Sequence, residues 1–540
     1  MNFNFNNPYT STRRPLFARN VVSTSHPLAA QAGLRMLLKG GNAVDAAVAT
    51  AAAMTIVEPV SNGLGSDAFC ILWDGQKLHG LNASGPAPAS WTPDYFRGKY
   101  GSAATTPPKR GMDSVSVPGA VAGWVSMSER FGKLPFADLL EPAIDIAERG
   151  YLLTPVVQQK WAAATDELKS QPGFAQSFLP WGRAPEVAEL FRFKAAARAL
   201  RAIAESRGKA YYGGEIAQTI ERFSRLHGGS LTARDFENYR PEWVQPIGKN
   251  YRGHTLHEIP PNGQGIAALI ALGILDQFDV ARLAVDEVDS QHLQIEAMKL
   301  AFADVYKYVA EPSFMEVTPA QMLQDDYLAS RAKLIDMKKA QDFGAGNPHD
   351  PHRRGGTVYL TAADEDGMMV SFIQSNYMGF GSGCVEPEFG ISLQNRGHGF
   401  SLQAGPNQVA PGKRPFHTII PAFLTKDGQP VMSFGVMGAN MQPQGHMQTL
   451  VRMLDYGQSP QAACCAPRWR YNAGLEINVE AALNPATVQG LAARGHRVEV
   501  INDSYQDFGA GQFIWRAGEP KVEGYVAASD ARRDGQAVGF

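Results

Sequence analysis

The chain has 540 residues, of which 44% are hydrophobic and 19% are charged, and its formal net charge is -2. This composition is ordinary for a globular protein, and the length is sufficient for two or more domains. The balanced charge argues against a nucleic-acid or anionic-membrane partner, because both require a strongly basic surface.

The cysteines and the N-terminal segment argue against two further classes of protein. No C-x-x-C pair occurs among Cys70, Cys384, Cys464 and Cys465, so we expect free thiols rather than a disulfide scaffold or a zinc knuckle. Residues 1–20 have no apolar segment after their arginines, and residues 43–60 are too polar for a membrane span. We therefore expect a cytoplasmic protein without a signal peptide.

Helical patterns dominate the first part of the chain. Residues 27–38 and 43–55 are predicted helices, separated by the helix-stop signal Gly40-Gly41. A third helix is predicted over residues 291–309, where apolar residues recur at a spacing that gives one buried face.

The pattern changes at residues 344–356, GAGNPHDPHRRGG, whose glycines and prolines predict an exposed linker. Beyond it, apolar runs at 357–363 and 368–375 flank a DG turn, and runs at 418–424 and 430–436 flank another, so two β-hairpins are predicted. Helices followed by strands indicate an α+β layer structure. The motif His349-Asp350-Pro351-His352 could ligate a metal, but its prolines favour a solvated loop, and no metal site is predicted.

Gly355-Gly356-Thr357 is the motif that suggests catalysis, although such a threonine usually just opens a strand. A threonine hydroxyl is a poor nucleophile without a nearby base. If the chain breaks before Thr357, its new α-amino group, with a pKa of about 7.7–8.0, becomes that base. The hydroxyl can cause the break by attacking the carbonyl of Gly356, where glycine removes steric hindrance.

Several further motifs occur along the chain in one order. They are GGNAVDAA at 40–47, SVPGAVAGW at 116–124, PPNGQG at 260–265, GGT at 355–357, DEDG at 364–367, FGSG at 380–383 and KRP at 413–415. Together they resemble the γ-glutamyltranspeptidase family of N-terminal nucleophile hydrolases.

The resemblance implies an αββα four-layer sandwich, made by cleavage into a large subunit, 1–356, and a small subunit, 357–540, that stay together. A dimer of such heterodimers is possible, and no cofactor is implied. Thr357 would be the nucleophile and base, and Ser375 would support it. Gly438 and Ala439 would offer backbone N–H groups to the oxyanion, which Ala439 tolerates if its φ stays negative.

The departures from the family pattern cluster on substrate recognition. Ser84 stands where the family has an arginine, and Arg396 and Gly399 replace an amide and a carboxylate. Tyr377 replaces an asparagine, and Asn376, one residue away in a strand, would face the opposite side. His417 and Thr418 replace two serines.

Without a carboxylate this subsite is unfit for a substrate ammonium, whereas Arg396 with His417 and Tyr377 favours a substrate carboxylate. The predicted substrate is a small anionic amide without a free α-amine, as in the oxamate amidohydrolase branch of the family.

Other readings of these residues stay open. Arg396 could be a surface or structural arginine, His417 a satisfied structural histidine, and Tyr377 part of the core. The rival functions are a γ-glutamyl hydrolase or transferase acting on glutathione, a cephalosporin-type acylase, and an inactive homologue.

Overall fold

The first sheet is assembled from both ends of the chain. The computed structural model describes residues 13–343, 355–503 and 507–540. The seven strands of this sheet are antiparallel and lie in the order β21 (Gln536–Gly539), β2 (Val21–Thr24), β10 (Gly355–Ala363), β11 (Met369–Met378), β3 (Asp67–Trp73), β4 (Leu78–Ala83) and β7 (Glu242–Val244). The strands that begin at Gly355 and Met369 are therefore central, and both neighbours of this pair come from earlier in the chain.

The second sheet is built in the same way. Its seven antiparallel strands lie in the order β1 (Leu16–Ala18), β20 (Tyr525–Ser529), β19 (Gly511–Arg516), β15 (Gln429–Val436), β14 (Ala422–Lys426), β9 (His254–Glu258) and β8 (Ile247–Tyr251). One buried cluster joins the facing sides of the sheets and includes Phe69, Tyr359 and Ile373 from the first sheet with Phe423 and Ile514 from the second. The two sheets are thus stacked face to face.

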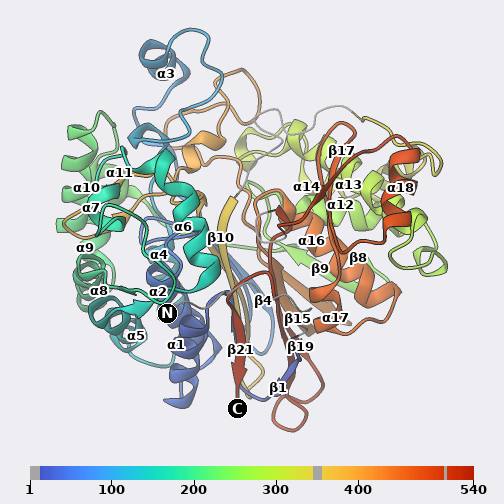
Figure 1. Ribbon diagram of the computed structural model, residues 1–540, viewed down its shortest axis with the longest axis horizontal. Coiled ribbons are helices and arrows are strands. Elements are labelled where there is room, and N and C mark those ends of the chain that lie inside the picture. The colour runs from blue at the N-terminus through green and yellow to red at the C-terminus, as the bar shows by residue number, and fades with distance from the viewer. Residues whose placement is uncertain (1–12, 344–354, 504–506) are drawn as a thin grey trace.

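Helices cover the outer face of each sheet, and separate buried clusters join each helical layer to its sheet. The layer on the first sheet contains α1 (Pro27–Leu38), α2 (Ala43–Val57), α4 (Ala120–Phe131), α5 (Phe136–Arg149), α6 (Pro155–Leu168), α7 (Phe174–Phe178), α8 (Lys194–Ser206), α9 (Lys209–Tyr212), α10 (Glu215–Leu226) and α11 (Ala233–Asn238). The layer on the second contains α12 (Ile266–Leu275), α13 (Val288–Tyr308), α14 (Pro319–Met322), α15 (Asp325–Ala332), α16 (Met441–Leu450), α17 (Pro460–Cys465) and α18 (Pro485–Ala493). Figure 1 shows the strands between these two groups of helices.

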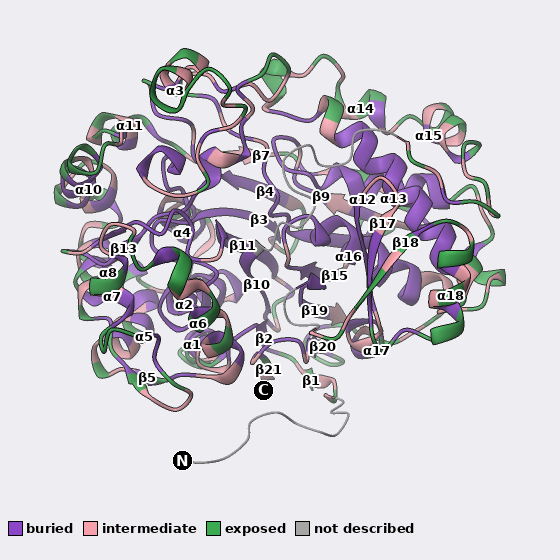
Figure 2. Ribbon diagram, turned by 45° about the horizontal axis from the view of Figure 1, so that its top comes forward, coloured by how far each residue is buried: buried purple, intermediate pink, exposed green. Residues whose placement is uncertain are grey.

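Smaller elements lie outside the four layers. They are α3 (Pro93–Tyr100), the sheet of β16 (Trp469–Ala473), β17 (Glu476–Glu480) and β18 (Arg497–Ile501), and the pairs β12 (Val385–Glu386) with β13 (Ile391–Ser392) and β5 (Tyr151–Leu152) with β6 (Leu190–Phe191). Figure 2 shows that exposed residues gather on the outer helices and loops, whereas the central strands are buried.

Helix α2 explains why an alanine-rich segment lies at the centre of the protein. Asn42 begins the helix with a capping box, in which its side chain accepts from the N–H of Asp45 while the Asp45 carboxylate accepts from the N–H of Asn42. Every residue from Ala43 to Val57 is buried. Small side chains allow this close packing on all sides, as expected for a core helix.

The predicted four-layer αββα sandwich is confirmed, and most predicted elements occur. Helix α1 spans the predicted residues, and α2 extends the predicted helix by two residues. Helix α13 begins three residues earlier and ends one residue earlier than predicted. Several strand boundaries were wrong, and β11 runs over 369–378 rather than 368–375. Gly355 and Gly356, predicted as linker, already pair with β11, and residues 418–421 are a loop rather than the start of β14. The rest of the linker, including the His349–His352 motif, lies outside the described residues.

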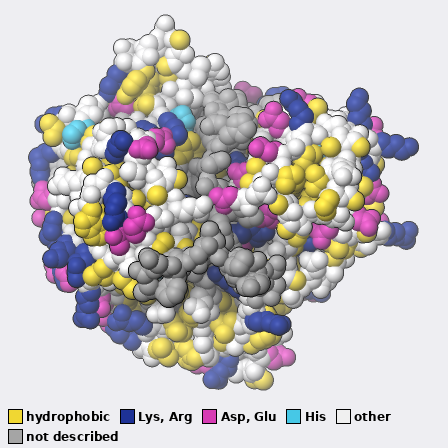
Figure 3. All heavy atoms as spheres, viewed as in Figure 1, with side chains coloured by type: hydrophobic (Ala, Val, Ile, Leu, Met, Phe, Trp, Pro, Cys, Tyr) yellow, Lys and Arg dark blue, Asp and Glu magenta, His cyan; other side chains and the backbone are white. Residues whose placement is uncertain are grey.

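The distribution of surface charge and the state of the cysteines agree with what the composition predicted. Acidic and basic side chains are interspersed on the face shown in Figure 3, without one basic patch. Cys70, Cys384, Cys464 and Cys465 are free, as predicted. No helix among residues 13–343, 355–503 and 507–540 is both long and apolar enough to cross a membrane.

Candidate active site

Thr357 lies at an irregularity in the central strand pair. Gly356 pairs with Tyr377 and Val358 pairs with Gln374, so two residues of β11, Ser375 and Asn376, stand opposite Thr357 alone. This is a β-bulge, a device that redirects a side chain at a chosen point of a sheet. Thr357 is only 3% exposed in the uncleaved chain.

The hydroxyl of Ser375 connects the predicted nucleophile to the carbonyl that it would attack. Thr357 Oγ1 donates to Ser375 Oγ over 3.2 Å, and Ser375 Oγ donates to the carbonyl oxygen of Gly356 over 2.7 Å. The N–H of Tyr377 donates to the same Ser375 oxygen over 2.7 Å. One buried hydroxyl is therefore fixed in orientation by three bonds, and it can move a proton between the Thr357 hydroxyl and the Gly356 carbonyl.

Glycine is required at position 356 because the backbone of the preceding loop packs against it. A Cβ built on Gly356 would lie 2.8 Å from the carbonyl oxygen of Val60 and 3.0 Å from Cα of Ser61. The N–H of Asn376 donates to the Ser61 carbonyl over 3.1 Å, which holds that loop against β11. The space beside the Gly356 carbonyl thus admits no side chain.

A buried charged cluster lies one strand further into the sheet. Asp67, the first residue of β3, pairs directly with Ser375, so the two side chains share a face. Asp67 Oδ2 lies 3.0 Å from His417 Nε2 and 3.8 Å from Arg396 Nε. Arg396 begins the short helix η4 (Arg396–Gly399) and is fully buried with both partners.

The guanidinium of Arg396 also reaches two other predicted residues. Its Nη1 donates to Thr418 Oγ1 over 3.0 Å, and its Cζ lies 4.3 Å from the centre of the Tyr377 ring. This cation–π contact joins the cluster to β11, because Tyr377 follows Ser375 by two residues. The structure therefore brings together Tyr377, Arg396, His417 and Thr418, as predicted.

Burial governs the titration of the acid and the imidazole in this cluster. Desolvation raises the pKa of Asp67 to about 7, although the Arg396 charge opposes this rise. Desolvation, with the nearby Arg396 charge, holds the pKa of His417 well below its ordinary value. His417 is thus neutral, which fits the structural reading of this histidine better than a catalytic one.

The absence of a carboxylate from this subsite, inferred from the sequence, is wrong. That inference followed Gly399 alone, whereas Asp67 supplies a carboxylate from a different strand. The sequence offered only a weak signal for it, an aspartate directly before an apolar strand in a glycine-rich segment. Asn376 was not expected to substitute for the asparagine that Tyr377 replaces, and its side chain bonds Ser66 and Ser392 instead.

The predicted oxyanion residues lie between β15 and α16. Gly438 has a φ of 123° and Ala439 a φ of 53°. The condition under which alanine would be tolerated at position 439, a negative φ, is therefore not met, and the left-handed conformation is strained for a residue with a Cβ. In the described parts of the chain, the N–H groups of Gly438 and Ala439 donate to no other residue. They are available to an oxyanion.

Gln264 joins this turn to the charged cluster. Its side-chain amide donates to the carbonyl oxygens of Thr418 over 2.6 Å and Ala439 over 3.0 Å. Its N–H donates to the carbonyl of His417 over 3.0 Å. The PPNGQG motif was recognised in the sequence, but the link that Gln264 makes between the turn and the cluster was not predicted. A continuous set of contacts thus runs from Thr357 through the cluster to Ala439.

Ser84, predicted at the family's arginine position, is bonded to neighbouring loops. Its hydroxyl donates to Asn82 Oδ1 over 2.6 Å and accepts from Asn262 Nδ2 over 3.2 Å. Its carbonyl accepts from Arg414 Nε over 3.1 Å. Ser84 therefore supports the loop beside Asp67, whose Oδ1 accepts from the N–H of Gly85 over 3.2 Å.

Two other features could be mistaken for sites. His292, Glu296 and His496 form a buried group of potential metal ligands. Its imidazoles bond each other over 2.8 Å, and Lys299 Nζ lies 2.7 Å from Glu296 Oε1, so a lysine ammonium already provides the cation.

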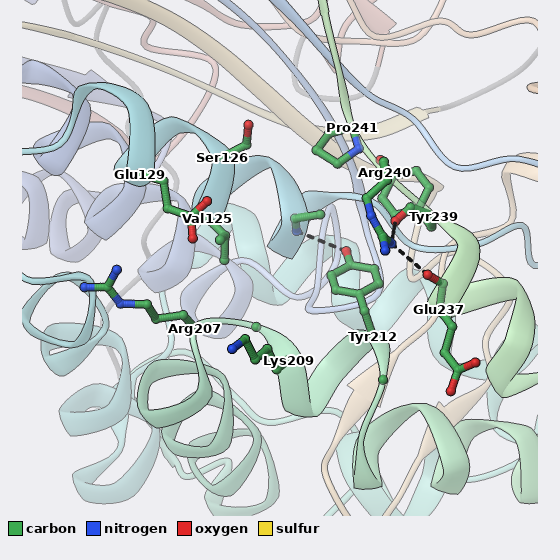
Figure 4. Close-up of a pocket in the computed structure, with 13 residues that line it drawn as sticks. Val125, Ser126, Glu129, Arg207, Lys209, Tyr212, Glu237, Tyr239, Arg240 and Pro241 are labelled. Carbon is green, nitrogen blue, oxygen red and sulfur yellow. Dashed lines mark hydrogen bonds between the residues drawn. The ribbon is translucent and has the colours of Figure 1, made fainter.

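A cavity of about 600 Å³ lies between α4, α9 and residues 237–241 (Figure 4). None of the predicted site residues lines it. Arg240 points its guanidinium to the carbonyls of Glu237 and Tyr239, and Tyr212 bonds the backbone of α4. Arg240 and Tyr212 thus serve the local fold.

Comparison with known proteins places this geometry in a family. The gamma-glutamyltranspeptidase family profile matches residues 29–540. A glutathione hydrolase-like YwrD proenzyme of Bacillus subtilis is 36% identical over 97% of this chain and 98% of its own, and an oxamate amidohydrolase proenzyme of Klebsiella pneumoniae is 34% identical over 95% and 97%. The crystal structure of a cephalosporin acylase from Bacillus halodurans superimposes with a TM-score of 0.94 at 48% identity, covering 100% of this chain and 99% of the other. The chain therefore belongs to the gamma-glutamyltranspeptidase family of N-terminal nucleophile hydrolases and is an enzyme of that family.

Proposed function

We propose that this protein cleaves its own chain between Gly356 and Thr357, and then uses Thr357 to hydrolyse the amide bond of a small carboxylate-bearing substrate of the oxamate type. The observation that carries this proposal is the pair of hydrogen bonds from Thr357 to Ser375 and from Ser375 to the Gly356 carbonyl. They connect the nucleophile, a proton carrier and the scissile carbonyl in the uncleaved chain.

Self-cleavage begins when Thr357 Oγ1 attacks the carbonyl carbon of Gly356. The hydroxyl proton passes to Ser375 Oγ while the Ser375 proton passes to the Gly356 oxygen, so no net charge develops in this buried place. The C–N bond then breaks as the proton on the Gly356 oxygen passes to the nitrogen of Thr357, which restores the carbonyl, frees the α-amine and leaves an ester on Oγ1. Water hydrolyses this ester and releases Gly356 as a carboxylate and the Thr357 hydroxyl.

The same hydroxyl then serves catalysis. The new α-amine takes the proton of Oγ1 as it attacks the substrate carbonyl, and the N–H groups of Gly438 and Ala439 stabilise the oxyanion. Loss of ammonia or an amine gives an ester on Thr357, which water hydrolyses. The two cleaved chains would stay together, because β10 pairs with β2 and β11 pairs with β3 across the break in the sequence.

The choice of substrate rests on Arg396, whose guanidinium lies against Tyr377 and bonds Thr418. Guanidinium groups recognise carboxylates. The relative named as an oxamate amidohydrolase supports an acyl group without an α-amine. A γ-glutamyl hydrolase is the second candidate, because the buried carboxylate of Asp67 beside Arg396 could receive a substrate ammonium.

Two measurements test the proposal. The mass of freshly purified, denatured protein should show two chains divided before Thr357, and Thr357→Ala should remain one chain without activity. Ammonia release from oxamate, compared with cleavage of a γ-glutamyl anilide and a glutaryl amide, distinguishes the substrates. A single persistent chain in the wild type, or full activity of Thr357→Ala, would overturn the mechanism.

A further inference from the structure

The cluster around Arg396 already contains a negative charge of its own. Asp67 Oδ2 lies 3.8 Å from Arg396 Nε, and all of Asp67, Arg396 and His417 have no exposed surface. A buried guanidinium without a counter-charge would be costly, so the carboxylate stabilises the arginine in the empty site.

The tautomer of His417 follows from its two neighbours. The N–H of Ile419 points to Nδ1 over 3.4 Å, so Nδ1 is the acceptor and Nε2 carries the proton toward Asp67 Oδ2. A neutral imidazole adds no charge to the cluster. With Asp67 ionised and Arg396 protonated, the three side chains sum to zero.

A substrate carboxylate at Arg396 would disturb this balance. Two carboxylates would then share one guanidinium in a fully buried place, and like charges so close cannot both stay ionised without a large cost. The cost is relieved if one of them takes up a proton from solvent. Asp67 is the one suited to do so, because burial has already raised its pKa to about 7, whereas a free carboxylate titrates far lower.

We propose that Asp67 is a specificity-determining residue of the acyl subsite, which neutralises Arg396 while the site is empty and takes up one proton when a substrate carboxylate binds. This inference rests on the proposed function. The proton comes from solvent on binding and returns on product release, so no group is consumed. Other charged or titratable groups act on Asp67 from neighbouring elements, namely Arg414, Tyr211, Tyr212 and Tyr239. In the processed enzyme the α-amine of Thr357, with an ordinary pKa of about 7.7–8.0, also titrates beside Ser375, the strand partner of Asp67.

The consequence is a binding constant that depends on pH only for anionic ligands. If binding requires protonated Asp67, affinity falls about tenfold for each pH unit above 7 and is level below it, which gives a change of about 25-fold between pH 6.5 and 8.5. A ligand with an ammonium group would behave in the opposite way, because ionised Asp67 would attract it.

Pyruvate is a suitable probe, because it has the shape and charge of oxamate with a methyl group in place of the amide nitrogen. Its inhibition constant against the processed enzyme should rise about 25-fold from pH 6.5 to 8.5. Calorimetry at pH 8.5 in two buffers of different ionisation enthalpy should show uptake of about one proton per pyruvate bound. Both measurements use the wild-type enzyme and so do not depend on the folding of a variant.

Asp67→Asn should remove most of the rise of the pyruvate inhibition constant with pH, and any rise that remains belongs to the Thr357 amine. At pH 8.5 the variant should bind pyruvate more tightly than the wild type does. Asp74→Asn is the matched control, because it removes a carboxylate that also bonds a histidine, His79, over 2.7 Å but away from the site. It should keep the wild-type profile.

The outcomes separate the two proposals. Absence of chain cleavage and of amide hydrolysis would overturn the proposed function itself. The role of Asp67 alone would be overturned by a cleaved, active enzyme with any one of three results. These are a pyruvate inhibition constant that does not change with pH, binding without proton uptake, or no binding of pyruvate. A γ-glutamyl amide that binds more tightly as the pH rises would do the same, and would assign Asp67 to a substrate ammonium.

Discussion

Removal of the Ser375 hydroxyl tests the proposed self-cleavage most directly. Ser375→Ala deletes the group that donates to the Gly356 carbonyl over 2.7 Å and accepts from Thr357 Oγ1 over 3.2 Å. Loss of one such donor from an oxyanion costs about 100- to 1000-fold in rate. Because the same hydroxyl also carries the proton, we expect cleavage to slow at least about 100-fold.

The substitution also affects stability, and this effect must be separated from the chemistry. The N–H of Tyr377 loses its bond to Ser375 in a fully buried place, which costs about 1–3 kcal/mol. Ser371→Ala is a matched control, because Ser371 is a buried serine of the same strand whose hydroxyl bonds Tyr359 over 2.7 Å. It should lower the free energy of unfolding comparably and leave cleavage unchanged.

The assay is a time course of intact mass after rapid purification, with urea unfolding of each variant in parallel. Ser375→Thr restores a hydroxyl at the same position and should recover most of the rate. The proposed proton transfer is refuted if folded Ser375→Ala cleaves as fast as Ser371→Ala.

Three further substitutions test other parts of the structure. Gly356→Ala places a Cβ 2.8 Å from the carbonyl of Val60, so the scissile carbonyl must shift and cleavage measured by mass should slow at least about tenfold; wild-type kinetics would contradict the tight packing. Ala439→Gly relieves a φ of 53°, so activity should persist and the free energy of unfolding in urea should stay equal or rise by about 1 kcal/mol; a clear loss would contradict the strain. The side chain of His26 caps α1 by accepting from the N–H of Leu28, and burial lowers its pKa to about 3. Below pH 6.5 the unfolded chain therefore binds a proton that the folded chain does not bind. The free energy of unfolding should fall by about 2 kcal/mol from pH 7 to 5. His26→Asn keeps the cap without titrating, so its urea midpoint should fall less between these pH values, and an undiminished fall would contradict the assignment.

Local sequence signals predicted those helices and hairpins whose ends are set by a few neighbouring residues. Gly40-Gly41 separates α1 from α2, and Asp366-Gly367 marks the hairpin of β10 and β11, because turns and helix ends depend on a few neighbouring residues. The start of β14 could not be predicted in this way. Residues 418–421 are as apolar as a strand, but Gln264 and Arg396 bind Thr418 there and hold it as a loop. Such long-range bonds override local propensity.

The site shows the same limit. Thr357, Ser375 and the residues around Arg396 could be placed by their motifs. Asp67, in contrast, acts through partners that are 329 to 350 residues away in sequence, and the side chain of Gln264 through partners that are 154 to 175 residues away. The motif comparison indicated a subsite without a carboxylate, because it considered only the position of Gly399. It could not show that another strand supplies one. The charge of a buried site is a property of everything packed around it. We therefore expect substrate preference in this protein to depend on the register that pairs Asp67 with Ser375 as much as on Arg396 itself.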